Sequence, residues 1–209
     1  MGCEENAAKA IDASLKRLDL DYIDLYLPHQ SMKDVYGSWR AIEKAYKAGK
    51  LKAIGVSNFY PARLMDLCLN AEIPPMANQV ELHPFFQQEK AVENMKQLNI
   101  VPEAWGPFAE GAHGIFTHPV LKEIGEKYSK TPAQVALRWN VQRGVVVLPK
   151  SVHKERIRQN MDIWDFSLNE SDMTKIAALN CTETSEIVNH FDPQTVRMIE
   201  NVRMQEETK

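Results

Sequence analysis

The chain has 209 residues, of which 44% are hydrophobic and 25% charged, and its formal net charge is −3. This composition is typical of a soluble globular protein and excludes a globally disordered chain. The negative net charge argues against nucleic acid as a partner, because neutralising phosphates requires clustered Lys and Arg. No apolar run approaches the roughly 18 residues that span a bilayer, so we expect no membrane partner either.

Short apolar runs alternate with longer amphipathic segments along the chain. Helical periodicity and helix-terminal residues predict helices at 6–17, 35–48, 61–69, 88–97, 119–128, 132–143, 154–161 and 171–178. Apolar runs bounded by turn residues predict strands at 22–27, 51–56, 77–82, 100–105 and 145–148. Gly49 and Gly144 are expected to end the helices before them, and a polar tail follows the last helix.

The N-terminal segment and the cysteines bear on where the protein works. No basic stretch followed by an apolar core opens the chain, so we expect no signal peptide. The cysteines Cys3, Cys68 and Cys181 are odd in number and widely spaced. This spacing favours reduced thiols over a disulfide framework or a zinc site. We therefore expect a cytoplasmic protein without a metal site.

The order of the elements predicts an α/β fold. Alternating strands and helices are typical of parallel pairing through helical crossovers. No G-x-G-x-x-G loop follows a strand, which argues against a doubly wound dinucleotide-binding fold. The remaining architecture is a parallel (β/α)8 TIM-barrel type, with functional residues at the C-terminal ends of its strands. Five strands are too few to close it, so we expect a single domain over residues 1–209 that forms an incomplete barrel.

An incomplete barrel leaves two strand edges without a partner. These edges are expected at the strands near residues 23 and 146. Unpaired edges are templates for association with another chain. Three outcomes are compatible with these edges: an open curved sheet, self-association into a dimer in which each copy closes the gap of the other, or the product of a truncated reading frame.

Polar or aromatic side chains stand where each predicted strand ends. The candidates are His29, Ser57, Asn58, Gln79, Trp105, Lys150 and Ser151. Taken singly, each suits a structural role; Ser57 and Asn58, for example, could cap the next helix. Together, Asn58 and Gln79 offer the donors and acceptors that suit an amide-bearing ring such as nicotinamide. Trp105 offers a flat face on which such a ring can stack.

A cationic corner follows the last predicted strand. Lys150, Ser151, the start of the next helix and Arg156 form an environment that suits a phosphate. Gln159 and Asn160, one turn further on, can contact the edge of an adenine. The sequence therefore predicts a nucleotide laid across the strand ends.

Several stretches resemble the aldo-keto reductase family. LDLDYIDLYLPH at 18–29, GKLKAIGVSNF at 49–59, NQVE at 78–81 and LPKSV at 148–152 carry the resemblance, which covers nearly the whole chain. Two of them match the long signatures of the family. EAWGP at 103–107 resembles its microbial branch of diketogluconate and methylglyoxal reductases.

The resemblance implies a (β/α)8 barrel, NADPH as hydride donor, and reduction of an aldehyde or ketone to an alcohol. His29 matches the histidine beside the carbonyl of a small substrate. The implied cofactor-binding residues are Ser57, Asn58, Gln79, Trp105, Gly106, Pro107, Lys150, Ser151, Val152, Arg156, Gln159 and Asn160. In the family the first three hold the carboxamide and the tryptophan stacks on nicotinamide. Contacts matching Lys150, Ser151 and Arg156 bind the 2′-phosphate, which favours NADPH over NADH.

The family's proton-donating Tyr, and the Asp and Lys that lower its pKa, have no counterpart in this sequence. The chain is therefore expected to lack the N-terminal third of the barrel and to show little or no turnover by itself. A second hypothesis is a nucleotide-binding or structural protein without chemistry. A third is a different barrel enzyme that uses His29 with Glu81 or Glu103 as acid and base.

Overall fold

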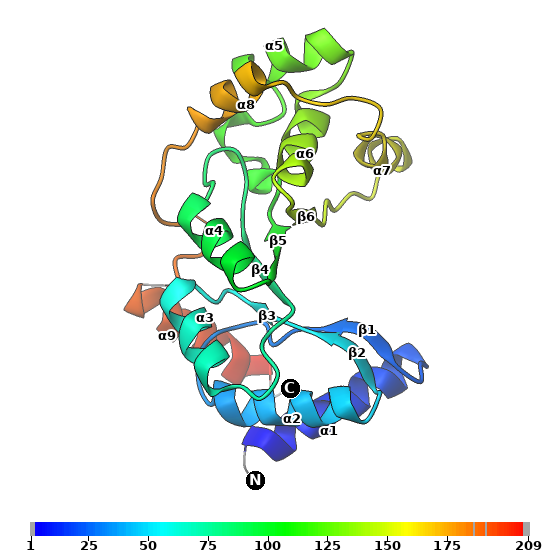
Figure 1. Cartoon of the computed structure of the whole chain (residues 1–209), viewed down its shortest axis with the longest axis vertical. Coiled ribbons are helices and arrows are strands. Elements are labelled where there is room, and N and C mark those ends of the chain that lie inside the picture. Colours follow the sequence, from blue (N-terminus) through cyan, green and yellow to red (C-terminus); the bar gives the residue numbers. More distant parts are fainter. Residues whose placement is uncertain (1–2, 186, 191, 207–209) are drawn as a thin grey trace. The chain divides into compact units, whose positions relative to one another are not determined.

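The computed structural model describes residues 3–185, 187–190 and 192–206 (Figure 1). Contacts group these residues into two compact units. Unit 1 comprises the described residues up to Val80, with Glu89–Trp105 and Gly144–Val146. Unit 2 comprises Glu81–Gln88, Gly106–Arg143 and the described residues from Val147 onward. One domain over 1–209 stays a prediction.

Unit 1 alternates helices and strands as the sequence predicts. Its elements are α1 (Cys3–Leu18), β1 (Ile23–Tyr26), α2 (Val35–Lys47), β2 (Leu51–Ile54), β3 (Val56–Ser57), α3 (Pro61–Asn70), β4 (Ala77–Glu81, its last residue in unit 2), α4 (Glu89–Gln97) and β5 (Val101–Trp105). α1 starts before the predicted position 6, with Glu4 and Glu5 in its first turn, where carboxylates interact favourably with the helix dipole. Gly49, at φ +78°, ends α2 as predicted.

The predicted strand 51–56 is divided at Gly55 into β2 and β3. A Cβ atom at Gly55 would lie 2.6 Å from the carbonyl oxygen of Ala77 and 2.6 Å from Leu27 Cδ2. Only glycine fits this approach of neighbouring segments without a shift. Because of this division the described residues hold six strands where the sequence predicts five.

The parallel α/β character of the fold is confirmed. β1 pairs with β2 in parallel, Ile23 opposite Leu51, and β3 pairs with β4 in parallel, Val56 opposite Asn78. The strand orders are β1-β2 and β3-β4-β5-β6, with β6 formed by Val146–Val147. Each order has two end strands, and the two predicted edge strands, β1 and β6, are among these four ends. The described residues do not reach the eight strands of a closed barrel.

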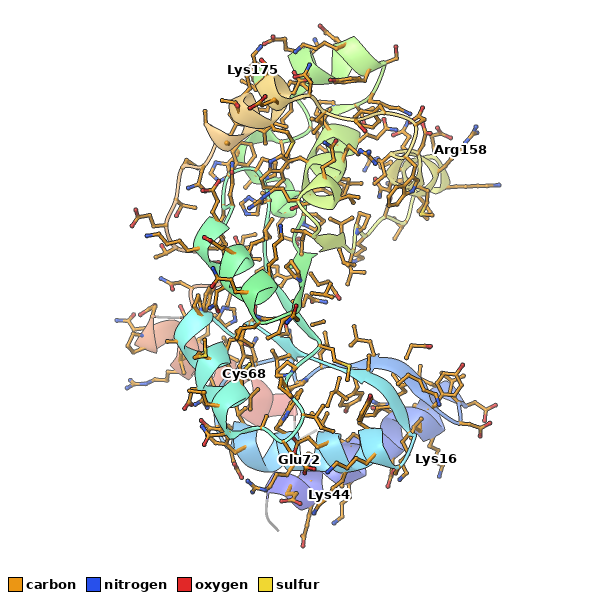
Figure 2. All side chains as sticks on the ribbon, in the orientation of Figure 1. Lys16, Lys44, Cys68, Glu72, Arg158 and Lys175 are labelled. Atoms are coloured by element: carbon orange, nitrogen blue, oxygen red, sulfur yellow. The ribbon has the colours of Figure 1, made fainter. Side chains whose placement is uncertain are left out.

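The core of unit 1 lies between its helices and strands. α2 packs against α1 and β2, and Lys44 of α2 (Figure 2) pairs with Glu4 of α1 at 2.6 Å. Trp39 and Ile42 of α2 are each 2% exposed. The indole N–H of Trp39 also donates to the carbonyl oxygen of Ile73 at 3.0 Å. Burial of these large side chains holds α2 against β2.

Unit 2 is built mainly from helices. Its elements are η1 (Ala109–Gly114, a 3-10 helix), α5 (Pro119–Tyr128), α6 (Pro132–Gln142), α7 (Lys154–Met161), α8 (Glu170–Ala177) and α9 (Pro193–Glu206). α5 packs against α6 and α8, and α6 packs against α7. Lys175 of α8 (Figure 2) pairs with Glu123 of α5 at 2.6 Å. Leu121, Val135 and Trp139 are fully or almost fully buried in this unit.

Helix α9 lies in the segment that the sequence pattern predicts as a polar tail. Its start carries helix signals that the hydrophobic pattern does not reveal. Asp192 accepts hydrogen bonds from the backbone N–H groups of Gln194 at 3.1 Å and Thr195 at 3.3 Å, and Pro193 occupies the first turn. An Asp cap followed by Pro is a common helix start.

Candidate functional site

The side chains predicted to hold nicotinamide lie together in unit 1. Ser57 ends β3, Asn58 follows it, Gln79 lies on β4 and Trp105 ends β5. These strands are neighbours in one sheet, so their C-terminal ends meet at one edge. Hydrogen bonds connect all four residues into one network.

Asn58 is the centre of this network. Its Oδ1 accepts from the indole N–H of Trp105 at 2.8 Å, and its Nδ2 donates to the backbone oxygen of His29 at 2.9 Å and to Ser57 Oγ at 3.2 Å. The residue is 3% exposed and has a φ of +61°. Asn tolerates this left-handed conformation better than most residues. One buried amide therefore fixes both the indole ring and the backbone that carries His29.

Gln79 is held by the residues around it. Ser57 Oγ donates to the backbone oxygen of Gln79 at 3.0 Å, and Gln79 Nε2 donates to Glu103 Oε1 of β5. Gln79 Oε1 forms no hydrogen bond with another described residue. The amide is thus oriented with its acceptor available to a ligand.

His29 stands just after β1 and is exposed. Only its backbone joins the network, and its ring forms no hydrogen bond within the described residues. The next residue, Gln30, has a buried Oε1 atom that lacks a hydrogen-bond partner there. Sequence reasoning missed Gln30, whose only signal is a polar side chain directly after the candidate histidine.

A pocket of about 360 Å³ lies in unit 2. It is lined by Phe108, Phe116, Thr131, Pro132, Ala133, Lys150, Ser151, Arg156, Gln159 and Asn160. Five of these were predicted to contact the nucleotide. Lys150 and Arg156 are exposed and form no ion pair within the described residues, and no Asp or Glu lines the pocket. Two uncompensated positive charges in a concave site favour an anion.

Helix α7 begins at the pocket and has the predicted bounds. His153 is its N-cap and provides no side-chain hydrogen bond to the first turn. The N–H groups of this turn therefore remain available to a ligand. Ser151 Oγ accepts from the backbone N–H of His153 at 3.1 Å, which holds Ser151 at the entrance to the helix. Gln159 and Asn160 lie further along α7 and are half-buried.

Sequence reasoning missed the lining contributed by the residues that flank η1 and by the start of α6. Phe108 and Phe116 flank η1, with ring centroids 5.5 Å apart at 56°. Several residues of the segment between them have positive φ, including the non-glycine residues Ala109, Glu110 and His113. Such a backbone is rare outside glycine, and the sequence gives no signal for it beyond Gly111 and Gly114.

Three further predicted residues lie in unit 2. Gly106 and Pro107 line a second pocket of about 260 Å³, which shares Phe108, Phe116 and Lys150 with the first. Val152 lines neither of these pockets, and its side chain is 82% exposed.

The carboxylates proposed as partners of His29 have other contacts. Glu81 Oε1 lies 3.1 Å from His83 Nε2, and Ser185 Oγ donates to Glu81 Oε2. The backbone N–H groups that follow donate to His83 Nδ1, so Nε2 carries the ring proton. Glu103 accepts from Gln79. In the described part of the chain, neither carboxylate is hydrogen-bonded to His29.

Two tyrosines are poorly suited to donate protons. The Tyr36 hydroxyl donates to Asp66, and the Tyr128 hydroxyl donates to Asp172 at 2.6 Å. Each hydrogen bond to a carboxylate raises the pKa of its tyrosine, because it stabilises the protonated phenol. These groups differ from a tyrosine whose pKa has been lowered for acid catalysis.

The described residues offer neither a metal-binding cluster nor a bilayer-spanning helix. Among the described residues, no group of three or more His, Cys, Asp or Glu could hold a metal ion. None of the helices that the structure describes is both long and apolar enough to cross a bilayer. Cys68, on α3 (Figure 2), and Cys181 are free thiols, and burial raises the pKa of the Cys68 thiol.

Comparison with known proteins decides the family. Residues 2–181 match the model of the aldo/keto reductase family. The chain belongs to this family. It is 49% identical to glyoxal reductase of Bacillus subtilis (strain 168) over 180 residues, 86% of this chain and 64% of that protein. It is 40% identical to methylglyoxal reductase DkgA of Escherichia coli (strain K12) over 175 residues, 82% of this chain and 64% of that protein.

A solved structure agrees with this assignment. The aldo-keto reductase of Bombyx mori in complex with NADP has a TM-score of 0.81 and 34% identity, with 85% of this chain and 64% of that chain covered. The predicted family, its microbial branch and the TIM-barrel type of fold are confirmed. The chain spans less than two thirds of the length of these relatives.

Proposed function

We propose that this chain binds NADPH and serves the reduction of aldehydes or ketones to alcohols, as an aldo/keto reductase. The observation that carries the proposal is the unit 2 pocket, where Lys150 and Arg156 lie without carboxylate partners beside the uncapped start of α7. A phosphate is the anion that such a corner suits. The NADP complex of the Bombyx mori relative supports this choice.

The pocket suits the adenosine end of NADPH. Lys150, Ser151 and Arg156 would hold the 2′-phosphate, which NADH lacks. Gln159 and Asn160 carry amides that can pair with an adenine edge. The volume of about 360 Å³ lies within the range of small-molecule pockets. Gly106 and Pro107, in the adjoining pocket, would contact the nucleotide through their backbone.

The unit 1 network suits the nicotinamide end. Trp105 would present its indole face to the ring, held in place by the hydrogen bond to Asn58. Gln79 Oε1 would accept from the carboxamide N–H. Ser57 and Asn58 donate to the backbone oxygens of Gln79 and His29, so their part would be to hold the network in place around the ring. When bound, NADPH supplies the hydride. The contribution of these residues is to orient the ring before reaction, which lowers the entropic cost of the step.

His29 would orient the substrate carbonyl. Its backbone is fixed by Asn58 while its ring is exposed, so the ring can reach a carbonyl oxygen brought to the strand ends. The relatives named for glyoxal and methylglyoxal point to small carbonyl compounds as the substrate class. A cytoplasmic location and the absence of nucleic-acid partners stay predictions.

The second candidate function is nucleotide binding without turnover. It is favoured by the tyrosines, because hydrogen bonds to carboxylates raise the pKa values of Tyr36 and Tyr128. Reduction needs a proton for the developing alkoxide, and general acid catalysis typically contributes about 10²–10⁴-fold. On this hypothesis the chain binds NADPH in the pocket but does not reduce methylglyoxal.

Two measurements separate these functions. The first is a titration of the purified chain with NADPH and with NADH, followed by quenching of Trp fluorescence. We expect saturable binding of NADPH and at least tenfold weaker binding of NADH, and a folded sample that binds neither would contradict both functions. The second is NADPH consumption with methylglyoxal. Turnover that exceeds a protein-free control selects the reductase, and none at saturating NADPH selects the binding function.

We also propose that the chain self-associates through its edge strands. Leu20, Tyr22 and Leu25 are 51%, 45% and 36% exposed around β1, and Val146 and Leu148 are 45% and 54% exposed around β6. Such edges favour pairing with a second copy. Sedimentation velocity should show a dimer that Leu25→Lys weakens, whereas Leu69→Lys on α3, also at an exposed leucine, should not. A wild-type monomer at all concentrations would contradict this proposal.

A further inference from the structure

Glu103 is a buried carboxylate with a neutral partner. Its side chain lies in the middle of β5 and is 6% exposed, and its Oε1 accepts from the amide of Gln79. It forms no ion pair with any described residue. A buried charge usually has a compensating cation, because removing it from water is costly. A positive charge on a ligand bound near Glu103 would therefore interact favourably with this carboxylate.

The position of Glu103 relates this charge to the nicotinamide network. Glu103 and Trp105 are two residues apart on one strand, so their side chains leave the same face, about 7 Å apart along the chain. Gln79, on the neighbouring strand, contacts Glu103, and Asn58 contacts Trp105. A ring stacked on Trp105 and bonded to Gln79 would lie over this carboxylate.

We infer that Glu103 is a positioning residue that also makes the site prefer the oxidised nucleotide over the reduced one. Its first role is to accept a hydrogen bond from Gln79 Nε2. This bond orients the amide so that Gln79 Oε1 can accept a hydrogen bond from the ligand. Its second role follows from charge. Glu103 faces a neutral ring in NADPH and a ring with one positive charge in NADP⁺. Because attraction between charges is stronger in a buried site than in water, it stabilises the oxidised ring selectively.

This inference rests on the proposed binding of NADPH, and it deepens that proposal by assigning a residue outside the predicted contact set. A purely structural role for Glu103 would affect both nucleotides equally. Selective stabilisation of NADP⁺ changes the ratio of the two dissociation constants. The ratio is therefore the quantity to measure, and it requires no turnover.

The experiment compares binding of NADP⁺ and NADPH by wild type and Glu103→Gln, using isothermal titration calorimetry. Gln keeps the size of the side chain and an acceptor for Gln79 but removes the charge. We expect Glu103→Gln to weaken NADP⁺ binding about fivefold to tenfold and to change NADPH binding less than about twofold. Glu93→Gln, which removes an exposed carboxylate from α4, should leave both constants unchanged.

A second variant covers the case in which Glu103→Gln does not fold. Glu103→Asp keeps the charge, so it should retain most of the wild-type ratio, with circular dichroism used to verify the fold of both variants. Equal changes for the two nucleotides, no change in Glu103→Gln, or loss of the ratio in a folded Glu103→Asp would overturn the inference. A wild-type chain that binds neither nucleotide would instead contradict the proposed function itself.

Discussion

The polar network of unit 1 and the pocket of unit 2 differ in burial and in charge. In unit 1, Asn58 is buried and its amide is engaged by Trp105, His29 and Ser57. In unit 2, the charged groups of Lys150 and Arg156 are exposed and form no ion pair within the described residues. Under the proposed function, a buried and preorganised network would hold the neutral nicotinamide ring, whereas exposed and hydrated cations would hold the phosphate.

The difference has consequences for stability and for affinity. Buried hydrogen bonds contribute to folding, because breaking them leaves polar groups unpaired in a low dielectric. Exposed cations contribute little to folding, but they attract an anionic ligand. Substitutions in the unit 1 network should therefore act mainly on the free energy of unfolding, and those in the unit 2 pocket on the dissociation constant of NADPH.

The largest expected effect is that of Asn58→Ala on stability. The change removes three hydrogen bonds and leaves the part-buried indole N–H of Trp105 without this acceptor, so the free energy of unfolding should fall by about 3 kcal/mol. Urea unfolding measures this change. Asn70→Ala, at an exposed residue that ends α3, should cost less than about 0.5 kcal/mol. Equal effects would contradict a structural role for the network.

A smaller effect is expected at Asp172, the buried acid of unit 2. Burial raises the pKa of Asp172, but hydrogen bonds from Lys127 and Tyr128 outweigh it and hold the pKa below its ordinary value. The resulting stabilisation is present above the unfolded-state pKa of about 3.9 and is lost as the pH falls through the lower folded-state pKa.

Asp172→Asn should therefore lower the free energy of unfolding by about 2 kcal/mol at pH 7. Its deficit relative to wild type should stay constant from about pH 5 to 8 and shrink below about pH 4. Asp165→Asn, at an exposed acid paired with Lys130, should have a clearly smaller effect than Asp172→Asn, because an exposed ion pair contributes little to stability. A deficit for Asp172→Asn that grows on acidification would contradict the assignment.

Arg156→Ala tests the pocket half directly. Loss of this cation should weaken NADPH binding by about tenfold, which corresponds to about 1.4 kcal/mol, and leave unfolding unchanged. NADH, which has no 2′-phosphate, should bind this variant and wild type equally. Lys154→Ala, at an exposed cation on the same helix that does not line the pocket, is the matched control. Equal loss for both variants would indicate only a general effect of charge.

The smallest effect is expected at Val152. Its side chain is 82% exposed and lines neither pocket, so Val152→Ser should change NADPH affinity less than about twofold. Titration of Val152→Ser and Arg156→Ala with NADPH, followed by Trp fluorescence, compares the two changes in affinity directly. A larger effect would show that this side chain reaches the nucleotide.

Sequence patterns predict the parts of this fold that depend on local periodicity. The alternation of helices and strands, the bounds of α7 and the convergence of Asn58, Gln79 and Trp105 all follow from apolar runs and the residues that end them. The division at Gly55 does not, because it depends on how closely Ala77 and Leu27 approach.

The rest of the site depends on contacts between distant residues. The Phe108–Phe116 pair requires several positive φ angles in the segment between the rings, which sequence periodicity does not encode. The role of Glu103 depends on a hydrogen bond to Gln79 of another strand. Helix α9 was missed for a different reason: its Asp192 cap was present in the sequence, but the hydrophobic pattern of the segment is weak.

The walls of the unit 2 pocket come from the residues that flank η1, from the start of α6, and from α7 and the residues before it, so the pocket exists only after these segments have folded. A compound that fills it binds the native chain alone and must raise the melting temperature by mass action. A ligand at a hundred times its dissociation constant adds about 2.7 kcal/mol to the native state. A simple thermal shift with adenosine 2′,5′-bisphosphate would thus report on the pocket without any substrate.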